Sequence, residues 1–142
     1  MTTTATTTAT TTTRTAGSGV AALIGFGVAA TAAASAATMI VAAAGNAAGV
    51  SLDVGGAPIP VSGFGVLTTV FSLVGVILAA VLARTARHPR RAFVRTTVVL
   101  TVLSLVPDVI VDAAPGTRAL LMLTHLVAAA IVIPVIARRL PA

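Results

Sequence analysis

The chain has 142 residues, of which 57% are hydrophobic and only 8% are charged, and its mean hydropathy is +1.08. A soluble domain carries roughly a quarter charged residues, so this composition excludes an ordinary soluble protein and indicates a protein embedded in a lipid bilayer. The sequence has no Cys, which excludes disulfides, thiolate metal sites and cysteine nucleophiles. The net charge of +6 comes from nine Arg set against three Asp. Because no stacking aromatic residues accompany the Arg, we expect no nucleic-acid binding.

Residues 1–18 are dominated by threonine, with eleven Thr in the first fifteen positions. Polar β-branched residues without apolar partners cannot bury enough surface to offset the entropy lost on ordering them. We therefore expect residues 1–18 to form a disordered cytoplasmic tail, ahead of a membrane domain at residues 19–140.

Apolar stretches follow the tail at about residues 19–44, 62–83, 94–113 and 117–137. Each is close to the roughly 20 residues that an α-helix needs to cross the hydrocarbon core. Only helices and closed barrels satisfy their backbone groups in lipid, and the alternation of a barrel strand is missing. The sequence therefore predicts an all-α fold, an integral membrane four-helix bundle.

The first stretch also has features of a signal peptide. Arg14 precedes it, and Ala-x-Ala cleavage sites occur around residues 32–37. Cleavage there would leave three spans. The apolar run continues well past these sites, which favours a helix that is kept in the protein, and the alternative stays open.

The connection at residues 45–61 is rich in Gly and Pro, which predicts turns or a short hairpin. The next connection contains a basic loop, made of Arg84, Arg87, Arg90, Arg91 and Arg95. With the N and C termini both cytoplasmic, eight Arg lie inside and Arg118 alone lies outside, as the positive-inside rule requires. We expect the basic loop to fix this orientation and to attract anionic lipid headgroups.

The third stretch carries polar residues on one face. They recur every three or four positions, the spacing of neighbours on one side of a helix. This polar stripe consists of Thr97, Thr101, Ser104, Asp108 and Asp112. The other stretches have seams of small or weakly polar residues, which let membrane helices approach closely and hydrogen-bond to one another. We therefore expect a compact bundle in which the stripe is used between helices.

Ionisable residues should gather in the outer half of the third and fourth helices, which are antiparallel neighbours across a short turn. The expected cluster consists of Asp108, Asp112, Arg118, Thr124 and His125. In a structural interpretation, Asp112 pairs with Arg118. Asp108 then bonds to His125 or Thr124, and the cluster clamps the two helices. In a functional interpretation, the cluster binds a cation or small ligand or moves a proton, the default for intramembrane ionisable residues. The cluster is expected to lie close to the outer surface of the bilayer, where nearby water makes charged side chains tolerable. This shallow position favours the structural interpretation, and the functional one stays open.

No motif indicates catalysis or a bound cofactor. GSGVAA at residues 17–22 has the spacing of a dinucleotide fingerprint, but no apolar strand precedes it. With two His, three Asp and neither Cys nor Glu in the chain, we expect no closed metal site. No nucleophile-elbow pattern supplies a reactive Ser. The sequence predicts no enzyme, no metal and no cofactor.

Three pieces of sequence carry a resemblance to a known family: the basic loop, SLVPD at residues 104–108, and LTHLVAAAIVIPVIARRL at residues 123–140. With them, residues 20–140 resemble a family of small bacterial membrane proteins catalogued as a domain of unknown function. The resemblance implies four transmembrane helices and a multi-pass protein of the bacterial plasma membrane, and it transfers no activity. We expect a structural or accessory protein that packs in the bilayer against a membrane protein partner or a second copy. The alternative is a small transporter or sensor that uses the cluster.

Overall fold

The computed structural model describes residues 16–142, with side chains from residue 19 onward, so most of the predicted tail lies outside the described residues. The helices are α1 (Ala16–Ala47), α2 (Val61–Thr85), α3 (Pro89–Ile110) and α4 (Pro115–Ala137). Each of these four is long and apolar enough to cross a membrane, which confirms the all-α prediction of four potential spans. α1 begins inside the segment that was expected to be tail, because Ala favours a helix more than the preceding Thr residues do.

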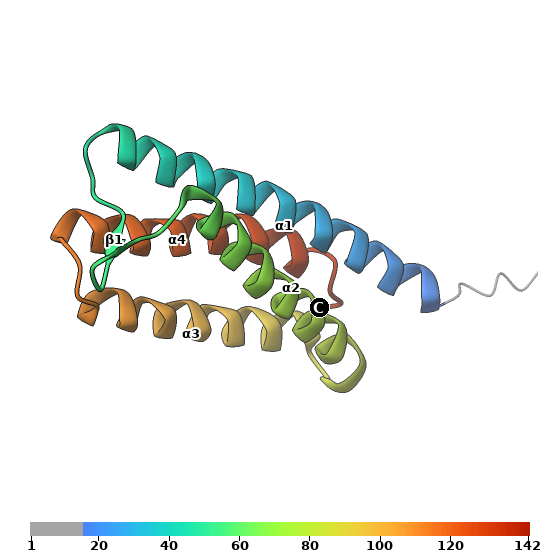
Figure 1. The fold of residues 1–142 in the computed structure, drawn as a ribbon. Helices are drawn as coiled ribbons and strands as arrows, with labels where there is room; N and C mark the ends of the chain where they lie inside the picture. Colours follow the sequence, from blue (N-terminus) through green and yellow to red (C-terminus); the bar gives the residue numbers. More distant parts are fainter. Residues whose placement is uncertain (1–15) are drawn as a thin grey trace, which may run out of the picture.

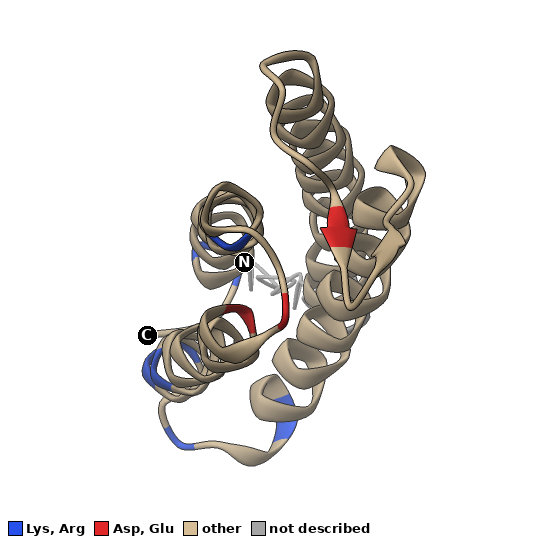
Figure 2. Cartoon of the chain, turned by 60° about the vertical axis from the view of Figure 1, so that its left-hand side comes forward, with Lys and Arg blue, Asp and Glu red and all other residues tan. Residues whose placement is uncertain are grey.

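α2 and α4 occupy the middle of the bundle, and α1 and α3 lie on opposite sides of them (Figure 1). Successive helices run antiparallel, so the bundle has two distinct ends. The basic end holds the start of α1, the connection from α2 to α3, and the residues that follow α4. The hairpin end holds the connection from α1 to α2 and the turn from α3 to α4, and the acidic residues gather there (Figure 2).

α1 approaches its neighbours closely because glycines face them. A Cβ atom added to Gly27 would lie 2.6 Å from Cγ2 of Val76 on α2. A Cβ atom added to Gly45 would lie 2.8 Å from Cδ1 of Leu120 on α4. Both distances are far below van der Waals contact, so a side chain at either position would require Val76 or Leu120 to move. The glycines allow the backbones to come together, as in other membrane helix pairs.

Hydroxyl groups bridge α1 and α2 beside this close approach. Oγ of Ser35 lies 2.8 Å from Oγ1 of Thr69, and Oγ1 of Thr38 lies 3.0 Å from Oγ1 of Thr68. Both α1 hydroxyls are buried. These are the hydrogen bonds between helices that the seams of small and weakly polar residues predict.

α3 is held mainly near its ends. Its buried residues are Pro89 and Phe93 at the basic end and Asp108 at the hairpin end, and no residue from 94 to 107 is fully buried. α3 also begins and ends earlier than predicted. Pro89 stands in the first turn, where its missing N–H costs nothing. The helix ends at Ile110 and not at residue 113, because Val111 is extended, with ψ at 146°.

The connection from α1 to α2 contains a β-hairpin with two residues in each strand. Strands β1 (Asp53–Val54) and β2 (Ala57–Pro58) pair antiparallel. Gly55 and Gly56 form the turn with φ values of +60° and +80°, which Gly adopts without strain. The predicted turn-rich connection therefore contains a short hairpin.

The residues that follow α4 fold back over the basic end. The guanidinium carbon of Arg139 lies 3.4 Å from the centroid of the Phe26 ring on α1, a cation–π contact. The side chain of Leu140 is buried, and the backbone N–H of Arg90 donates to the carbonyl of Pro141 over 3.2 Å. This segment joins α1 and α3 at the basic end.

Candidate functional site

Asp108 and His125 form a charge contact between α3 and α4. Oδ2 of Asp108 lies 2.8 Å from Nδ1 of His125, and only 7% of Asp108 is exposed. The same Nδ1 lies 3.0 Å from the carbonyl oxygen of Leu121. Both neighbours of Nδ1 are acceptors, so this nitrogen carries a proton. It donates that proton to the carbonyl, and the carboxylate lies close beside the N–H without aligned hydrogen-bond geometry.

The contact also shows that α3 and α4 are not level at the hairpin end. Ten residues of α4 precede His125, whereas only two residues of α3 follow Asp108. At 1.5 Å per residue, α4 extends roughly 12 Å further than α3. Val111 and Ala114, at the two ends of the connection, have extended backbones with ψ angles of 146° and 150°, and the chain bends between them. The connection from α3 to α4 runs beside the first turns of α4, which extend beyond the end of α3.

Three of the five residues predicted to form the cluster make no hydrogen bond or ion pair with Asp108 or the ring of His125 within the described chain. The side chain of Asp112 is exposed beyond the end of α3. The Nε atom of Arg118 is buried and has no hydrogen-bond partner within the described residues. The predicted pair between Asp112 and Arg118 is not formed within that part of the chain, because α3 ends before Asp112 and no longer directs it toward α4. Thr124 donates its hydroxyl to the carbonyl of Leu121 over 2.7 Å, not to Asp108.

The β-hairpin is fastened to the turn between α3 and α4. The backbone N–H of Gly55 donates to the carbonyl of Asp112 over 2.8 Å. The hydroxyl of Thr117, which is buried, donates to the carbonyl of Ser51. Neither bond has a spacing signal in the sequence, since the partners are distant in the chain and each bond involves at least one backbone group.

The hydroxyl groups of the polar stripe bond within α3 itself. Thr97 donates to the carbonyl of Phe93 over 2.8 Å, and Thr101 donates to that of Thr97 over 2.8 Å. Ser104 donates to the carbonyl of Thr101 over 2.7 Å. The expectation that these hydroxyls connect helices is wrong. No hydrogen bond joins them to a hydroxyl of α2, and a cavity lies between the two helices at this level.

This cavity has a volume of about 460 Å³ and lies between α2, α3 and α4. Most of its lining is aliphatic or aromatic, and it extends along α4 from Leu121 to Ile133. Twelve residues of helix are roughly 18 Å long, whereas a sphere of the same volume would be only about 10 Å across. The cavity therefore extends along the helices, from Leu121 to Ile133 on α4.

Two polar groups in the lining have no internal partner. Ser72 on α2 is 7% exposed, and its hydroxyl forms no hydrogen bond with any described residue. His125 also lines the cavity, and its Nε2 is likewise without a hydrogen bond inside the described chain. In the sequence, Ser72 recurs with Thr68 and Gly75 at the spacing of a seam of small and weakly polar residues. The same spacing describes a cavity-lining residue, so spacing alone does not separate the two roles.

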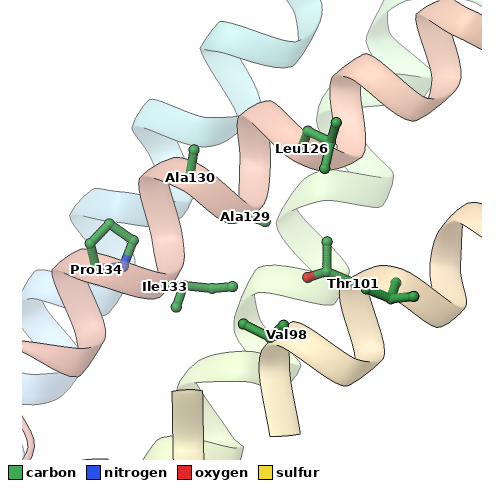
Figure 3. A pocket seen from close by; sticks show the side chains of 8 residues that line it. Val98, Thr101, Leu126, Ala129, Ala130, Ile133 and Pro134 are labelled. Carbon is green, nitrogen blue, oxygen red and sulfur yellow. The ribbon is translucent and has the colours of Figure 1, made fainter. Parts of the chain in front are cut away.

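A second groove, of about 400 Å³, lies on the other side of α3, against α4. Figure 3 shows Val98 and Thr101 on α3 opposite Ala129 and Ile133 on α4. Thr101, Ala129 and Ile133 line both the groove and the cavity. Around Thr101, the groove therefore lies on one side of the contact between α3 and α4, and the cavity lies on the other side.

The basic loop is at the opposite end of the bundle from the pair. Its five members are exposed, and they are Arg84, Arg87, Arg90, Arg91 and Arg95. No carboxylate lies within ion-pair distance of them in the described part of the chain. They are free to face water or lipid headgroups.

No curated protein and no solved structure matches the chain. A family described as a family of unknown function, DUF6069, matches residues 18–142. The match takes in α2, α3, α4, the hairpin and nearly all of α1. The chain therefore belongs to this family, which agrees with the resemblance found in the sequence.

Proposed function

We propose that the protein is a multi-pass membrane protein that binds a small, largely apolar ligand in the cavity between α2, α3 and α4. The observation that carries the proposal is the cavity itself, about 460 Å³ beside a polar stripe that makes no bond to α2. The cavity is open to the outside between α2 and α3, where Leu67, Phe71 and Leu100 are exposed, so a ligand can enter it without a change in the fold. Ligand sites typically have volumes of about 300–1,000 Å³ and an apolar lining with a few polar groups.

In this proposal the pair of Asp108 and His125 has a structural and a binding role together. It holds the hairpin end of α3 against α4, and Phe93 holds the basic end. The cavity lies between these two attachments. The histidine also presents a ring nitrogen without a partner to a ligand, and the carboxylate keeps its ring oriented, as the partners of functional histidines do.

A structural or accessory role is the second candidate. The observation in its favour is that the charge contact and the docked hairpin account for Asp108, His125 and Thr117 without any ligand. In that case the cavity would be filled by lipid tails or by a helix of a partner protein, and it would show no selectivity.

A filled cavity tests the ligand proposal. Gly75 lines the cavity, and a Cβ atom added there meets nothing within 4 Å, so Gly75→Leu should fill space without a clash. Gly25→Leu is the matched control, because Gly25 on α1 is exposed and equally unobstructed. The probe is a small phenyl diazirine, cross-linked to protein in lipid nanodiscs and mapped by peptide mass spectrometry.

We expect saturable labelling of cavity-lining residues in the parent and in Gly25→Leu, and loss of that labelling in Gly75→Leu. Equal labelling in all three proteins, without saturation, would mean that the cavity is no ligand site. The accessory role would then be the better proposal.

We also propose that the basic end faces the cytoplasm of a bacterial cell, with the plasma membrane as the location. Seven Arg lie at that end of the described chain, against Arg118 at the hairpin end, which follows the positive-inside rule. Because the chain has no Cys, a single introduced Cys reports which side of the membrane its position faces. Ser51→Cys should react with an impermeant maleimide in intact cells, and Thr85→Cys only after permeabilisation. The reverse pattern would invert the orientation.

A further inference from the structure

We propose that the groove between α3 and α4 binds one phospholipid with an anionic headgroup. The acyl chain lies in the groove, and the phosphate meets arginines of the basic end. The groove is on the outer surface of the bundle, and this proposal does not depend on the ligand function proposed for the cavity. It is carried by the helix faces that form the groove, by the length of the groove, and by the distribution of charge.

The face of α3 that lines the groove continues into two arginines. Val98 and Val102 line the groove, and both are exposed. Arg91 and Arg95 precede them, so the four residues recur at spacings of four, three and four. Residues at these spacings lie on one side of a helix. Arg95 therefore lies about one turn from the groove, and Arg91 lies about one turn nearer the start of α3.

α4 brings a third arginine to the same end of the groove. Ala130 and Pro134 line the groove, and Arg138 follows Pro134 by four positions. The backbone of Arg138 is still helical, with φ at −68° and ψ at −15°, so this spacing places it near the face of Pro134. Because α3 and α4 run antiparallel, Pro134 and Val98 both mark the end of the groove that is nearest the basic end (Figure 3).

The groove is long enough for much of an acyl chain. On α4 it runs from Pro134 to Leu126, which is roughly 12 Å at 1.5 Å per residue. One leaflet is half of a hydrocarbon core about 30 Å thick, so the groove covers most of its depth. The lining is apolar apart from Thr101, whose hydroxyl donates to the carbonyl of Thr97. An acyl chain parallel to the helices therefore contacts the groove without burying an unbonded hydroxyl.

The charge at this end of the groove selects an anionic headgroup. Arg91, Arg95 and Arg138 are exposed, and no carboxylate in the described part of the chain lies within ion-pair distance of them. All three Asp lie at the hairpin end (Figure 2). A guanidinium binds a phosphate through two parallel N–H donors. A phosphatidylcholine headgroup would add a positive charge beside three arginines, whereas phosphatidylglycerol adds none.

The depth of Arg95 is a separate reason to expect a bound anion. Arg95 lies in a helix that is apolar enough to cross a membrane, six positions after its first residue, Pro89. It is therefore roughly 9 Å from the end of the helix. An arginine at this depth is tolerated when its long side chain reaches the interface or its charge is paired. A phosphate at the end of the groove would pair with it.

A single introduced Trp can report on bound lipid, because the chain has no Trp. Val99→Trp places the reporter beside the groove and outside its lining, since Val99 is exposed and adjoins Val98. Ile77→Trp is the matched reporter, because Ile77 is also exposed and lies at a similar distance from the basic end, on α2. The full chain is placed in phosphatidylcholine nanodiscs with a rising fraction of phosphatidylglycerol. One of the two lipids carries bromine in its acyl chains and quenches Trp fluorescence.

Brominated phosphatidylglycerol should quench Val99→Trp half-maximally at a fraction about fivefold lower than it quenches Ile77→Trp. This is the enrichment expected from the attraction of about one arginine near an anionic lipid. Brominated phosphatidylcholine should show no such enrichment beside the groove. The two reporters thus compare the groove with the lipid around the rest of the bundle.

Paired arginine substitutions separate a site from a general attraction to the basic end. Arg91→Gln combined with Arg95→Gln should remove the enrichment at the Val99→Trp reporter. Arg84→Gln combined with Arg87→Gln is the control and should keep most of it. The control removes the same charge from the same end, and neither of its residues lines the groove or lies on the helix face that leads into it. All four arginines are exposed, so neither pair disturbs the core.

A filled groove tests the acyl chain. Ala130 is exposed and lines the groove, so Ala130→Leu should occupy the space of the chain and remove most of the enrichment. Ala119→Leu is the control, because Ala119 is exposed on the same helix and lies outside the groove.

Three results would overturn the inference. Equal quenching at the two reporters, or equal losses from the two arginine pairs, would mean that no site exists at the groove. Equal enrichment of brominated phosphatidylcholine would mean that the headgroup is not selected. A loss with the arginines of α3 but none with Ala130→Leu would mean that a phosphate binds without the chain, and inorganic phosphate should then compete. The test of the cavity with Gly75→Leu is separate, so each proposal can fail alone.

Discussion

α1 and α3 lie on opposite sides of the same two helices, and they are attached by different contacts. On α1, Gly27 and Gly45 let the backbones approach, and the nearby hydroxyls then bond across to α2. On α3, the hydroxyls of the polar stripe turn back to their own backbone, and a cavity fills the space to α2. In this bundle the hydroxyls bond between helices where α1 and α2 are closely packed, and they bond within their own helix where a cavity lies beside α3.

The largest effect should come from the attachment of α3 at the basic end. Phe93 has no exposed surface and belongs to the main apolar core. Phe93→Ala should lower the free energy of unfolding by about 3–5 kcal/mol, the usual cost of removing a buried Phe. Unfolding in mixed detergent, followed by circular dichroism, measures this. Val99→Ala is the control, since Val99 is 56% exposed on the same helix, and equal costs for the two variants would refute the end attachment.

The close approach of α1 should be the next most sensitive feature. Gly27→Val would place side-chain atoms against Val76, and such overpacking costs about 1–3 kcal/mol. Gly25→Val lies two residues away on the same helix, where an added Cβ meets nothing within 4 Å. The difference in melting temperature between these variants cancels their shared change in helix propensity. If the two variants melt together, α1 is not held by close backbone contact.

The charge contact of α3 should give a smaller effect. In a double-mutant cycle of Asp108→Asn and His125→Ala, we expect a coupling free energy of about 1 kcal/mol. Residues in contact couple by about 0.5–3 kcal/mol, and 37% of the histidine side chain is exposed, which places this pair toward the low end. Strictly additive effects would show that the contact does not attach α3 to α4.

The smallest effect on stability should come from removing single hydroxyl groups, and it should differ between hydroxyls that bond to another helix and hydroxyls that bond within their own helix. Thr38→Val removes a bond between α1 and α2 and should cost about 0.6 kcal/mol, the average for such bonds in membranes. Thr101→Val removes a bond within α3 and should leave the melting temperature nearly unchanged, because no partner on another helix is lost. The comparison uses the same substitution at both positions. A larger cost at Thr101 than at Thr38 would contradict the distinction between the two sides.

The architecture could be predicted from the sequence because lipid permits few alternatives. Apolar runs of spanning length specify helices, and the Gly-rich and Pro-rich connection specifies a turn. The residues at which α3 begins and ends were harder to predict. Pro89 extends the helix backward, and the extended residues after Ile110 shorten it. Those limits depend on how far α4 protrudes, which is a property of the packed bundle.

The candidate site was predictable only in part. Two helices joined by a short turn bring their facing residues together, so Asp108 was expected near His125 or Thr124, and it lies beside His125. The same reasoning placed Asp112 with Arg118, and the early end of α3 separates them. The cavity was not predictable, because a polar stripe that packs and a polar stripe that faces a void have the same spacing. The distance between α2 and α3 decides between them, and no local pattern encodes that distance.

Pro107 gives α3 a mechanical property. It lies inside the helix, directly before Asp108, and it supplies no N–H to the carbonyl of Leu103. The helix is therefore weakest beside one of its fastenings, while Phe93 fastens the other end. A helix that lacks one backbone hydrogen bond bends most easily at that point. Any bend in α3 should therefore be centred beside Asp108, and the segment between Phe93 and Pro107 should move as one straight piece relative to α2.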